Sequence, residues 1–282
     1  TGSYNIASGD SALKKNTTGS YNTASGRGAL YSNTTGDYNI ASGYQSLYSN
    51  TTGSYNTASG YSALAFNKTG SFNMASGMNA LASNSSGTYN MAMGWNALQF
   101  SNGHSNMGLG TQALQKNTTG SNNTAIGSLS LNSNTSGSNN IGIGINAGFS
   151  NQTGSRNVFI GYQAGYSETG SDKLYIDNSN TASPLIYGDF ANNALTVNGT
   201  LTATGGVTTT GIYHTNGTKM LSLENGEVHL GPTSMIFTDS TISGNADIMS
   251  STVGKVQIGK NATDSTTVVG SLSVQTPTAA AH

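Results

Sequence analysis

The chain has 282 residues, of which 7% are charged and 34% are hydrophobic, and 38 are glycine. A typical globular domain carries about 25% charged residues, so one chain of this composition has little material for an ordinary globular core. The formal net charge of −1, without any basic stripe, disfavours nucleic acid as a partner. No run of 18 apolar residues occurs, so we expect no membrane-spanning helix.

Ten repeats of about 17 residues account for the chain up to Gly170. Each repeat contains an asparagine that is followed by glycine four residues later and preceded by glycine three residues earlier, as in Gly2, Asn5 and Gly9. The repeat asparagines are Asn5, Asn22, Asn39, Asn56, Asn73, Asn90, Asn106, Asn123, Asn140 and Asn157, spaced by 17 residues with one spacing of 16. Such a period predicts a solenoid, in which each coil buries the face of its neighbour.

The consensus of the repeat is T-G-S-Y-N-x-A-x-G-x-x-A-L-x-x-N-T. Its N-x-A-x-G part alternates as a β-strand does, whereas the Asn-Thr-Thr-Gly parts, such as residues 16–19, have turn chemistry. We therefore expect a coil of two short strands and two turns. The two x positions share one face of the strand, and we expect that face to point inward.

The second x position changes along the chain from serine to larger apolar residues. Its occupants are Ser8, Ser25, Ser42, Ser59, Ser76, Met93, Leu109, Ile126, Ile143 and Ile160. At about 25 cal/mol per Å² of buried apolar surface, each change from serine to isoleucine is worth roughly 1–3 kcal/mol per chain. The C-terminal half of the repeats is therefore expected to be the drier and more stable half.

Two of the later repeats resemble a known protein family. Residues 140–144 (Asn-Ile-Gly-Ile-Gly) and 157–161 (Asn-Val-Phe-Ile-Gly) resemble the S/N-V-A-I-G motif of trimeric autotransporter adhesin heads, and the longer coil is similar to the shafts of phage tail fibres and bacterial surface fibres. The resemblance covers residues 1–170. It implies an all-β fold, a left-handed parallel β-roll of three chains packed about one axis, and an adhesive role. The early repeats depart from the motif by carrying serine in place of isoleucine.

The period stops after Gly170. Residues 171–200 are expected to cap the stack, and they resemble the short connector that follows such repeats in fibre proteins. Residues 201–254 are expected to form a small β domain or an intertwined β-prism. Residues 255–282 resemble the intertwined β rungs near the ends of fibre shafts, which implies such a rung with a truncated end. Asn-Gly steps within alternating sequence predict hairpins; they lie at residues 198–199, 216–217 and 225–226. Because the chain starts with Thr1 inside a repeat, we expect a fragment of a longer protein, whose export signal or anchor lies outside it.

Two sets of residues are candidates for ligand binding. The first combines charged, imidazole and large apolar side chains in the segment 201–254: Glu224, Glu227, His229, Met235 and Phe237. The second is a row of aromatic residues that precede the repeat asparagines: Tyr4, Tyr21, Tyr38, Tyr55, Phe72 and Tyr89. A looser second row consists of Tyr44, Tyr61, Trp95 and Tyr162. Sugars stack on aromatic faces, but we favour packing between coils or chains for these rows, and we expect recognition in the first set.

No catalytic or cofactor motif is present. The sequence has no P-loop, no G-x-S-x-G and no H-E-x-x-H, and its histidines do not have metal-ligand spacing. We expect His104 to be a solvated turn residue. Glu224 and Glu227 could serve a glycosidase, but a solvated hairpin tip is the simpler interpretation. The sequons at Asn16, Asn33 and Asn50 are interpreted as turns. We therefore predict a protein that is not an enzyme and binds no cofactor or metal.

These features favour a homotrimeric fibrous adhesin or tail-fibre-like protein, located extracellularly on a cell surface or in a virion fibre. Its rod would project a binding region toward cell-surface glycans or another envelope component. Two alternatives stay open. A monomeric ice-binding solenoid is suggested by threonine rows such as Thr17, Thr34 and Thr51, and a glycan-cleaving tailspike is the third hypothesis.

Overall fold

The computed structural model of the chain describes residues 2–200, 212–213, 219–224 and 227–230. The chain divides into two compact units, Thr1–Leu201 and Thr202–His282. In the described parts of the chain, no helix is long and apolar enough to cross a membrane.

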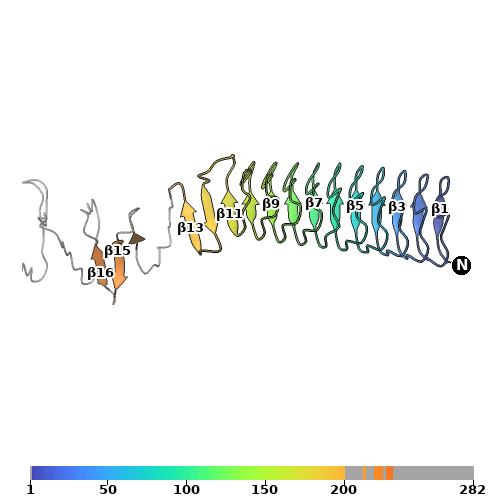
Figure 1. Cartoon of the computed structure of the whole chain (residues 1–282), viewed down its shortest axis with the longest axis horizontal. Helices are drawn as coiled ribbons and strands as arrows, with labels where there is room; N and C mark the ends of the chain where they lie inside the picture. Colours follow the sequence, from blue (N-terminus) through green and yellow to red (C-terminus); the bar gives the residue numbers. More distant parts are fainter. Residues whose placement is uncertain (1, 201–211, 214–218, 225–226, 231–282) are drawn as a thin grey trace, which may run out of the picture. The chain divides into compact units, whose positions relative to one another are not determined.

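The first unit contains a parallel β-solenoid of ten coils, each with one three-residue strand (Figure 1). The strands are β1 (Ile6–Ser8), β2 (Thr23–Ser25), β3 (Ile40–Ser42), β4 (Thr57–Ser59), β5 (Met74–Ser76), β6 (Met91–Met93), β7 (Met107–Leu109), β8 (Thr124–Ile126), β9 (Ile141–Ile143) and β10 (Val158–Ile160). We number the coils after these strands. Equivalent residues of neighbouring coils pair in register, so that Ala24 lies beside Ala41. The predicted repeat of ten coils is confirmed, but the expectation of two strands per coil is wrong.

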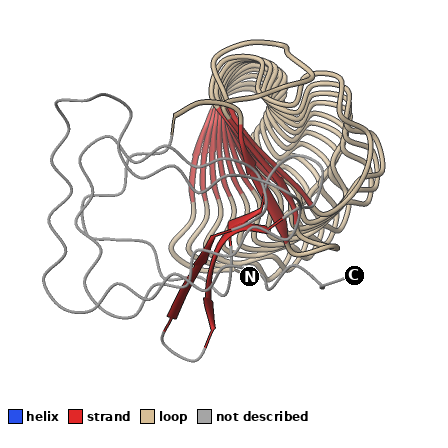
Figure 2. Cartoon of the chain, turned by 90° about the vertical axis from the view of Figure 1, so that its left-hand side faces the viewer, coloured by secondary structure: helices blue, strands red, loops and turns tan. Residues whose placement is uncertain are grey.

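Turns replace the expected second strand because four positions in each coil have positive φ. In the third coil these are Tyr38 (56°), Gly43 (134°), Gln45 (52°) and Leu47 (50°). Left-handed backbone curls the chain tightly, which closes a coil within 17 residues. Gly43 also approaches the next coil so closely that a Cβ atom at this position would lie 2.5 Å from the carbonyl oxygen of Gly60. Viewed along the stack, the strands form one wall and loops form the rest (Figure 2).

The interior of the solenoid is filled by small residues and one leucine per coil. In the fourth coil the middle strand residue Ala58 and the pair Ala63-Leu64 are fully buried. The two x positions of the same strand are Thr57, which is half-buried, and Ser59, which is exposed. Our expectation that the x positions point inward is therefore wrong for the single chain. Alternate residues of a strand face opposite sides, and the narrow interior accepts the alanine methyl group.

Two rows of asparagines tie the coils together inside the turns. In the repeat-asparagine row, Asn39 donates its amide to the carbonyl of Gly53 at 2.9 Å and accepts the backbone N–H of Asn56 at 3.0 Å. In a second row, Asn50 donates to the same Gly53 carbonyl at 2.9 Å and to Asn33 Oδ1 at 2.8 Å. These side chains are buried, and buried polar groups stabilise a fold only when they are hydrogen-bonded. The recurring asparagines thus form two hydrogen-bonded ladders inside the solenoid.

The last coil is covered by a short antiparallel extension. Strand β11 (Lys173–Ile176) pairs in parallel with β10, and β12 (Ile186–Asp189) and β13 (Ala194–Val197) continue the sheet in antiparallel order. The ring of Tyr175 lies 5.9 Å from that of Phe159 in the core and 5.2 Å from that of Tyr187. Its hydroxyl donates to Glu168 at 2.7 Å, and burial together with this bond raises the pKa of Tyr175.

The second unit contains a three-stranded antiparallel sheet of β14 (Ile212–Tyr213), β15 (Lys219–Glu224) and β16 (Glu227–Leu230). Strands β15 and β16 pair on either side of residues 225–226, as a hairpin at that Asn-Gly step requires. The remainder of the predicted β domain, and all of the predicted rung at 255–282, lie outside the described residues.

Candidate functional site

The outer face of the solenoid sheet exposes the x positions of the ten strands. From the sixth coil onward its second row is apolar and in register, with Ile143 39% exposed. We call this row the outer stripe: Met93, Leu109, Ile126, Ile143 and Ile160. In the first five coils the same row is serine, and neither x row contains a charged residue in any coil. We therefore treat the outer stripe as a candidate interaction surface, because contiguous exposed apolar patches are uncommon on soluble monomers.

An aromatic ladder flanks this face, at the positions that the sequence predicts. Consecutive rings are stacked, with centroids 4.8–5.0 Å apart and interplanar angles of 2–14°. The ladder consists of Tyr4, Tyr21, Tyr38, Tyr55, Phe72 and Tyr89. Because each inner ring has another ring on both sides, its faces are not free to stack on a sugar. A carbohydrate platform along the whole ladder, which requires free faces, does not fit this geometry.

The backbone of the ladder is unfavourable for aromatic residues. Tyr55 has φ 58° and Tyr89 has φ 58°, in the left-handed region. This conformation costs roughly 1–2 kcal/mol for most residues other than glycine and asparagine. Coils eight and nine carry Asn122 and Asn139 at the same position, with φ 59° and 60°. Stacking, worth about 0.5–1.5 kcal/mol per aromatic pair beyond area burial, offsets this cost in the ladder.

The looser second row is only partly stacked. Tyr44 and Tyr61 have ring centroids 5.0 Å apart, whereas Trp95 and Tyr162 are exposed and stack on no other ring of the described chain. A third row, nine residues after the repeat asparagine, was not predicted. It contains the stacked pairs Tyr31–Tyr48 and Phe149–Tyr166, both at 4.9 Å. The signal was available in the sequence, because like residues recur at this position in adjacent repeats.

In the one coil that is a residue shorter than the others, a side chain takes the place of a backbone hydrogen-bond acceptor. In the early coils a turn carbonyl, such as that of Thr34, accepts three backbone N–H groups from the coil before it. In the shortened coil the side-chain oxygen of Asn102 takes this role and accepts from Ser85, Ser86 and Gly87 at 3.0, 2.9 and 3.3 Å.

His104 occupies a row in which serine hydroxyls accept backbone N–H groups. Its Nδ1 accepts the backbone N–H of Thr88 at 3.2 Å and lies 2.9 Å from the Thr88 hydroxyl. The side chain is exposed, as expected for a turn residue. It also has a specific partner, which the prediction of a solvated turn residue did not include.

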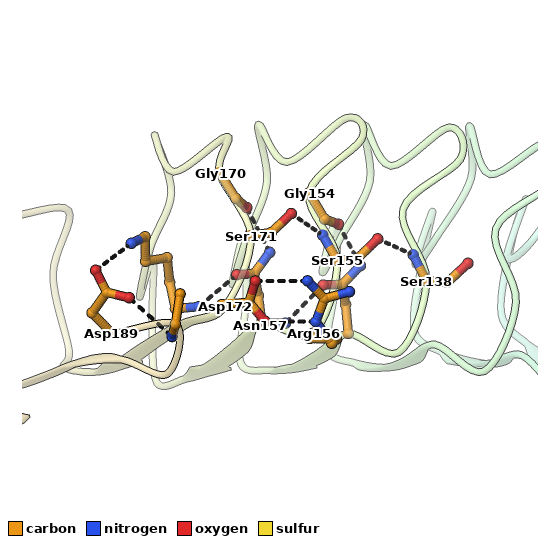
Figure 3. Close-up of polar contacts among 12 residues, drawn as sticks. Ser138, Gly154, Ser155, Arg156, Asn157, Gly170, Ser171, Asp172 and Asp189 are labelled. Carbon is orange, nitrogen blue, oxygen red and sulfur yellow. Dashed lines mark hydrogen bonds and ion pairs between the residues drawn. The ribbon is translucent and has the colours of Figure 1, made fainter. Parts of the chain in front are cut away.

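An ion-pair cluster lies where the solenoid meets β11 and β12 (Figure 3). Arg156 and Asp172 occupy successive positions of the row that contains the aromatic ladder, and they form two hydrogen bonds of 2.6 and 2.7 Å. Lys173 donates to Asp189 at 2.8 Å. The bonds from Lys173 and then Asn192 lower the pKa of Asp189 to about 2, and the bond from Arg156 lowers the pKa of Asp172.

The candidate ligand-binding residues of the segment 201–254 are only partly covered by the described structure. Glu224 on β15 pairs directly with Glu227 on β16, and His229 pairs with Ser222. Met235 and Phe237 lie outside the described residues. The backbone therefore places three of the five predicted residues on two adjacent strands.

The polar residues of the turns are engaged within the solenoid. The hydroxyls of Thr17, Thr34 and Thr51 donate to carbonyls of the following coil at 2.7, 2.9 and 2.9 Å. The sequon residues Asn33 and Asn50 are fully buried, which agrees with their interpretation as turn residues.

A cavity of about 280 Å³ lies beside the cap and is lined by residues that include Glu168, Tyr175 and Asn180. The Glu168 carboxylate already accepts the N–H groups of Thr169 and Gly170 as well as the Tyr175 hydroxyl. No cluster of three side chains able to hold a metal ion occurs in the described ranges. Comparison of the chain with protein-family models, with curated proteins and with solved structures found no match.

Proposed function

We propose that this chain is a rod segment of a homotrimeric fibre, in which three solenoids pack through the sheet face that carries the outer stripe. The observation that carries the proposal is the exposure of Ile126, Ile143 and Ile160 on a face without charge. Exposed apolar area of this kind is stabilised by burial against a partner, at about 25 cal/mol per Å².

A second and third copy of the chain fit this face better than an unrelated partner. Equivalent residues recur at every coil in register, so a copy with the same spacing can match the stripe along its whole length. The resemblance of residues 140–144 and 157–161 to trimeric autotransporter adhesin heads supports three copies and a left-handed winding. It also supports an adhesive fibre on a cell surface or virion that attaches to glycans or other envelope components.

In this proposal the solenoid is a spacer and the segment 201–254 contributes recognition, through Glu224, Glu227 and His229 on its paired strands. The ice-binding hypothesis loses support, because the hydroxyls of Thr34 and Thr51 donate hydrogen bonds to carbonyls of the chain itself. No observation favours the glycan-cleaving tailspike, and the absence of enzymatic activity stays a prediction.

The mass of the chain in solution tests the assembly. Sedimentation equilibrium at micromolar concentration should give three chains, and Ile143→Asp should shift the mass toward one chain while the far-ultraviolet spectrum is retained. Ser133→Asp is the matched control, because the equivalent position of the preceding coil is already charged, as Lys116. A native chain that sediments as a monomer would contradict the trimer.

A further inference from the structure

The aromatic ladder ends at a step between the sixth and seventh coils. Tyr89 is its last ring, and the equivalent residue of the next coil is Ser105. Tyr89 stacks on Phe72 on one side, with ring centroids 4.9 Å apart, and on no other ring of the described chain. Its side chain is accordingly 61% exposed, compared with 51% for Tyr55 inside the ladder. The step therefore frees one face of the Tyr89 ring.

Small polar side chains continue the row beyond this free face. Ser105, Asn122 and Asn139 are all exposed, and we call them the polar row. Where the structure is described, no hydrogen bond engages the Ser105 hydroxyl or the side-chain amides of Asn122 and Asn139. In contrast, the next residue of the row, Arg156, is held by Asp172. At the coil spacing of about 4.8 Å, Tyr89 and the polar row together extend over on the order of 15 Å.

His104 adds a further donor beside the step. Its Nδ1 accepts the backbone N–H of Thr88 at 3.2 Å. An imidazole that accepts at Nδ1 carries its proton on Nε2 when neutral. Within the described residues Nε2 has no hydrogen-bond partner, so it remains available to donate to a ligand.

We propose that the free face of Tyr89 and the polar row form a binding site for a neutral linear oligosaccharide. A sugar ring has an apolar C–H face, which packs on an aromatic ring, and hydroxyl groups at its edge. Amide side chains both donate and accept hydrogen bonds, so Asn122 and Asn139 suit hydroxyls that do the same. The ligand is neutral because the polar row carries no charge and the Arg156 guanidinium at its end is already paired.

The backbone at Tyr89 supports a role beyond packing. Tyr89 and Tyr55 have the same φ of 58°, so they bear the same conformational cost. Tyr55 is stacked on both sides, whereas Tyr89 is stacked on one. Asparagine, which tolerates this conformation, replaces the aromatic residue two coils later. A ligand that covers the free face would supply the missing contact.

This site rests on the adhesive part of the proposed function and adds a recognition surface on the solenoid to the one proposed for residues 201–254. It does not depend on the number of chains. The test uses the whole chain on an array of immobilised neutral oligosaccharides built from hexoses and N-acetylhexosamines. We expect the native chain to bind at least one of them. Tyr89→Asn should weaken that binding by about tenfold, the effect of losing one stacking contact, and the double variant Asn122→Ala, Asn139→Ala should weaken it further.

Tyr55→Asn is the matched control, because it makes the same change at the same backbone conformation inside the ladder. It should lower the melting temperature more than Tyr89→Asn does, yet leave sugar binding within about twofold. Failure of the native chain to bind any arrayed oligosaccharide would overturn the site, as would unchanged binding by Tyr89→Asn, which would assign recognition elsewhere. Sedimentation of the same samples separates the two proposals, since a trimer that binds no sugar contradicts only the site.

Discussion

The ring of Phe159 lies directly against Gly165, in the space that a leucine side chain fills in the earlier coils. The leucine row runs through the first eight coils and becomes Gly148 and Gly165 in the last two. Phe159 stands where the earlier strands have alanine or glycine, and it is fully buried. One large ring thus replaces two leucines at the end of the core.

Phe159→Ala should destabilise the solenoid by about 3–5 kcal/mol, because it leaves a cavity in a closely packed core. Adding Gly148→Leu and Gly165→Leu to that variant should restore much of the loss. Both glycines have φ near 60° (62° and 59°), and leucine at this position in other coils is found at 47–52° where it forms the buried row. Denaturant unfolding measures both effects. If the two leucines did not restore stability, the idea that Phe159 replaces two leucines of the core would be refuted.

The two faces of the strands should respond differently to charge. Ala58→Asp places a charge in the interior and should prevent folding of the coil, because a buried unpaired charge is strongly unfavourable. Ile143→Asp lies on the outer face, so it should abolish association without loss of the solenoid spectrum. Ser25→Asp, on the serine part of the same face, should have a small effect. Equal melting temperatures for Ala58→Asp and Ser25→Asp would show that the faces are wrongly assigned.

Each internal asparagine should contribute through several hydrogen bonds at once. Asn56 donates to Asn39 Oδ1 and to the carbonyl of Gly70, at 3.1 and 2.9 Å, and accepts the backbone N–H of Asn73 at 3.0 Å. Asn56→Ala leaves these buried partners unsatisfied, so a loss of about 1–3 kcal/mol is expected. Thr52→Ala, in the exposed part of the turn, serves as the control in thermal unfolding. Equal melting temperatures for the two variants would contradict an internal ladder.

The ion pairs at the junction predict sensitivity to acid. The pKa of Asp189 falls from its ordinary value of 3.8 to about 2 in the folded chain. A lowered carboxyl pKa stabilises the fold above about pH 4, and this contribution is lost as the pH falls through about 2. Amide exchange in β11 and β12 should therefore quicken between these values. Asp189→Asn should remove most of this dependence, and an unchanged profile in that variant would argue against the Lys173 contact as its source.

The sequence predicted the coils well because a strict period needs no knowledge of packing. The asparagine and glycine positions specify where each coil begins, and the aromatic ladder follows from stacking equal positions. The direction of the x positions could not be derived in this way, because alternation shows that two faces differ and not which is inside. The width of the interior, suited to Ala58 and Leu64, decides that. The sequence likewise does not show that both faces of each inner ladder ring are covered, because that depends on how the rings are oriented in space.

The shortened coil gives the last prediction. Three backbone N–H groups, from Ser85, Ser86 and Gly87, meet at the side-chain oxygen of Asn102 because this coil lacks one residue of the turn. Asn102→Ala removes their acceptor and should lower the free energy of unfolding by about 1–3 kcal/mol. Replacing Asn102 by two threonines restores the turn of the early coils, in which one backbone carbonyl accepts the three equivalent groups, and should recover the loss. Asn102→Asp keeps the oxygen and should stay near the native value. If the two-threonine variant were as unstable as Asn102→Ala, the asparagine oxygen could not be acting in place of a turn carbonyl.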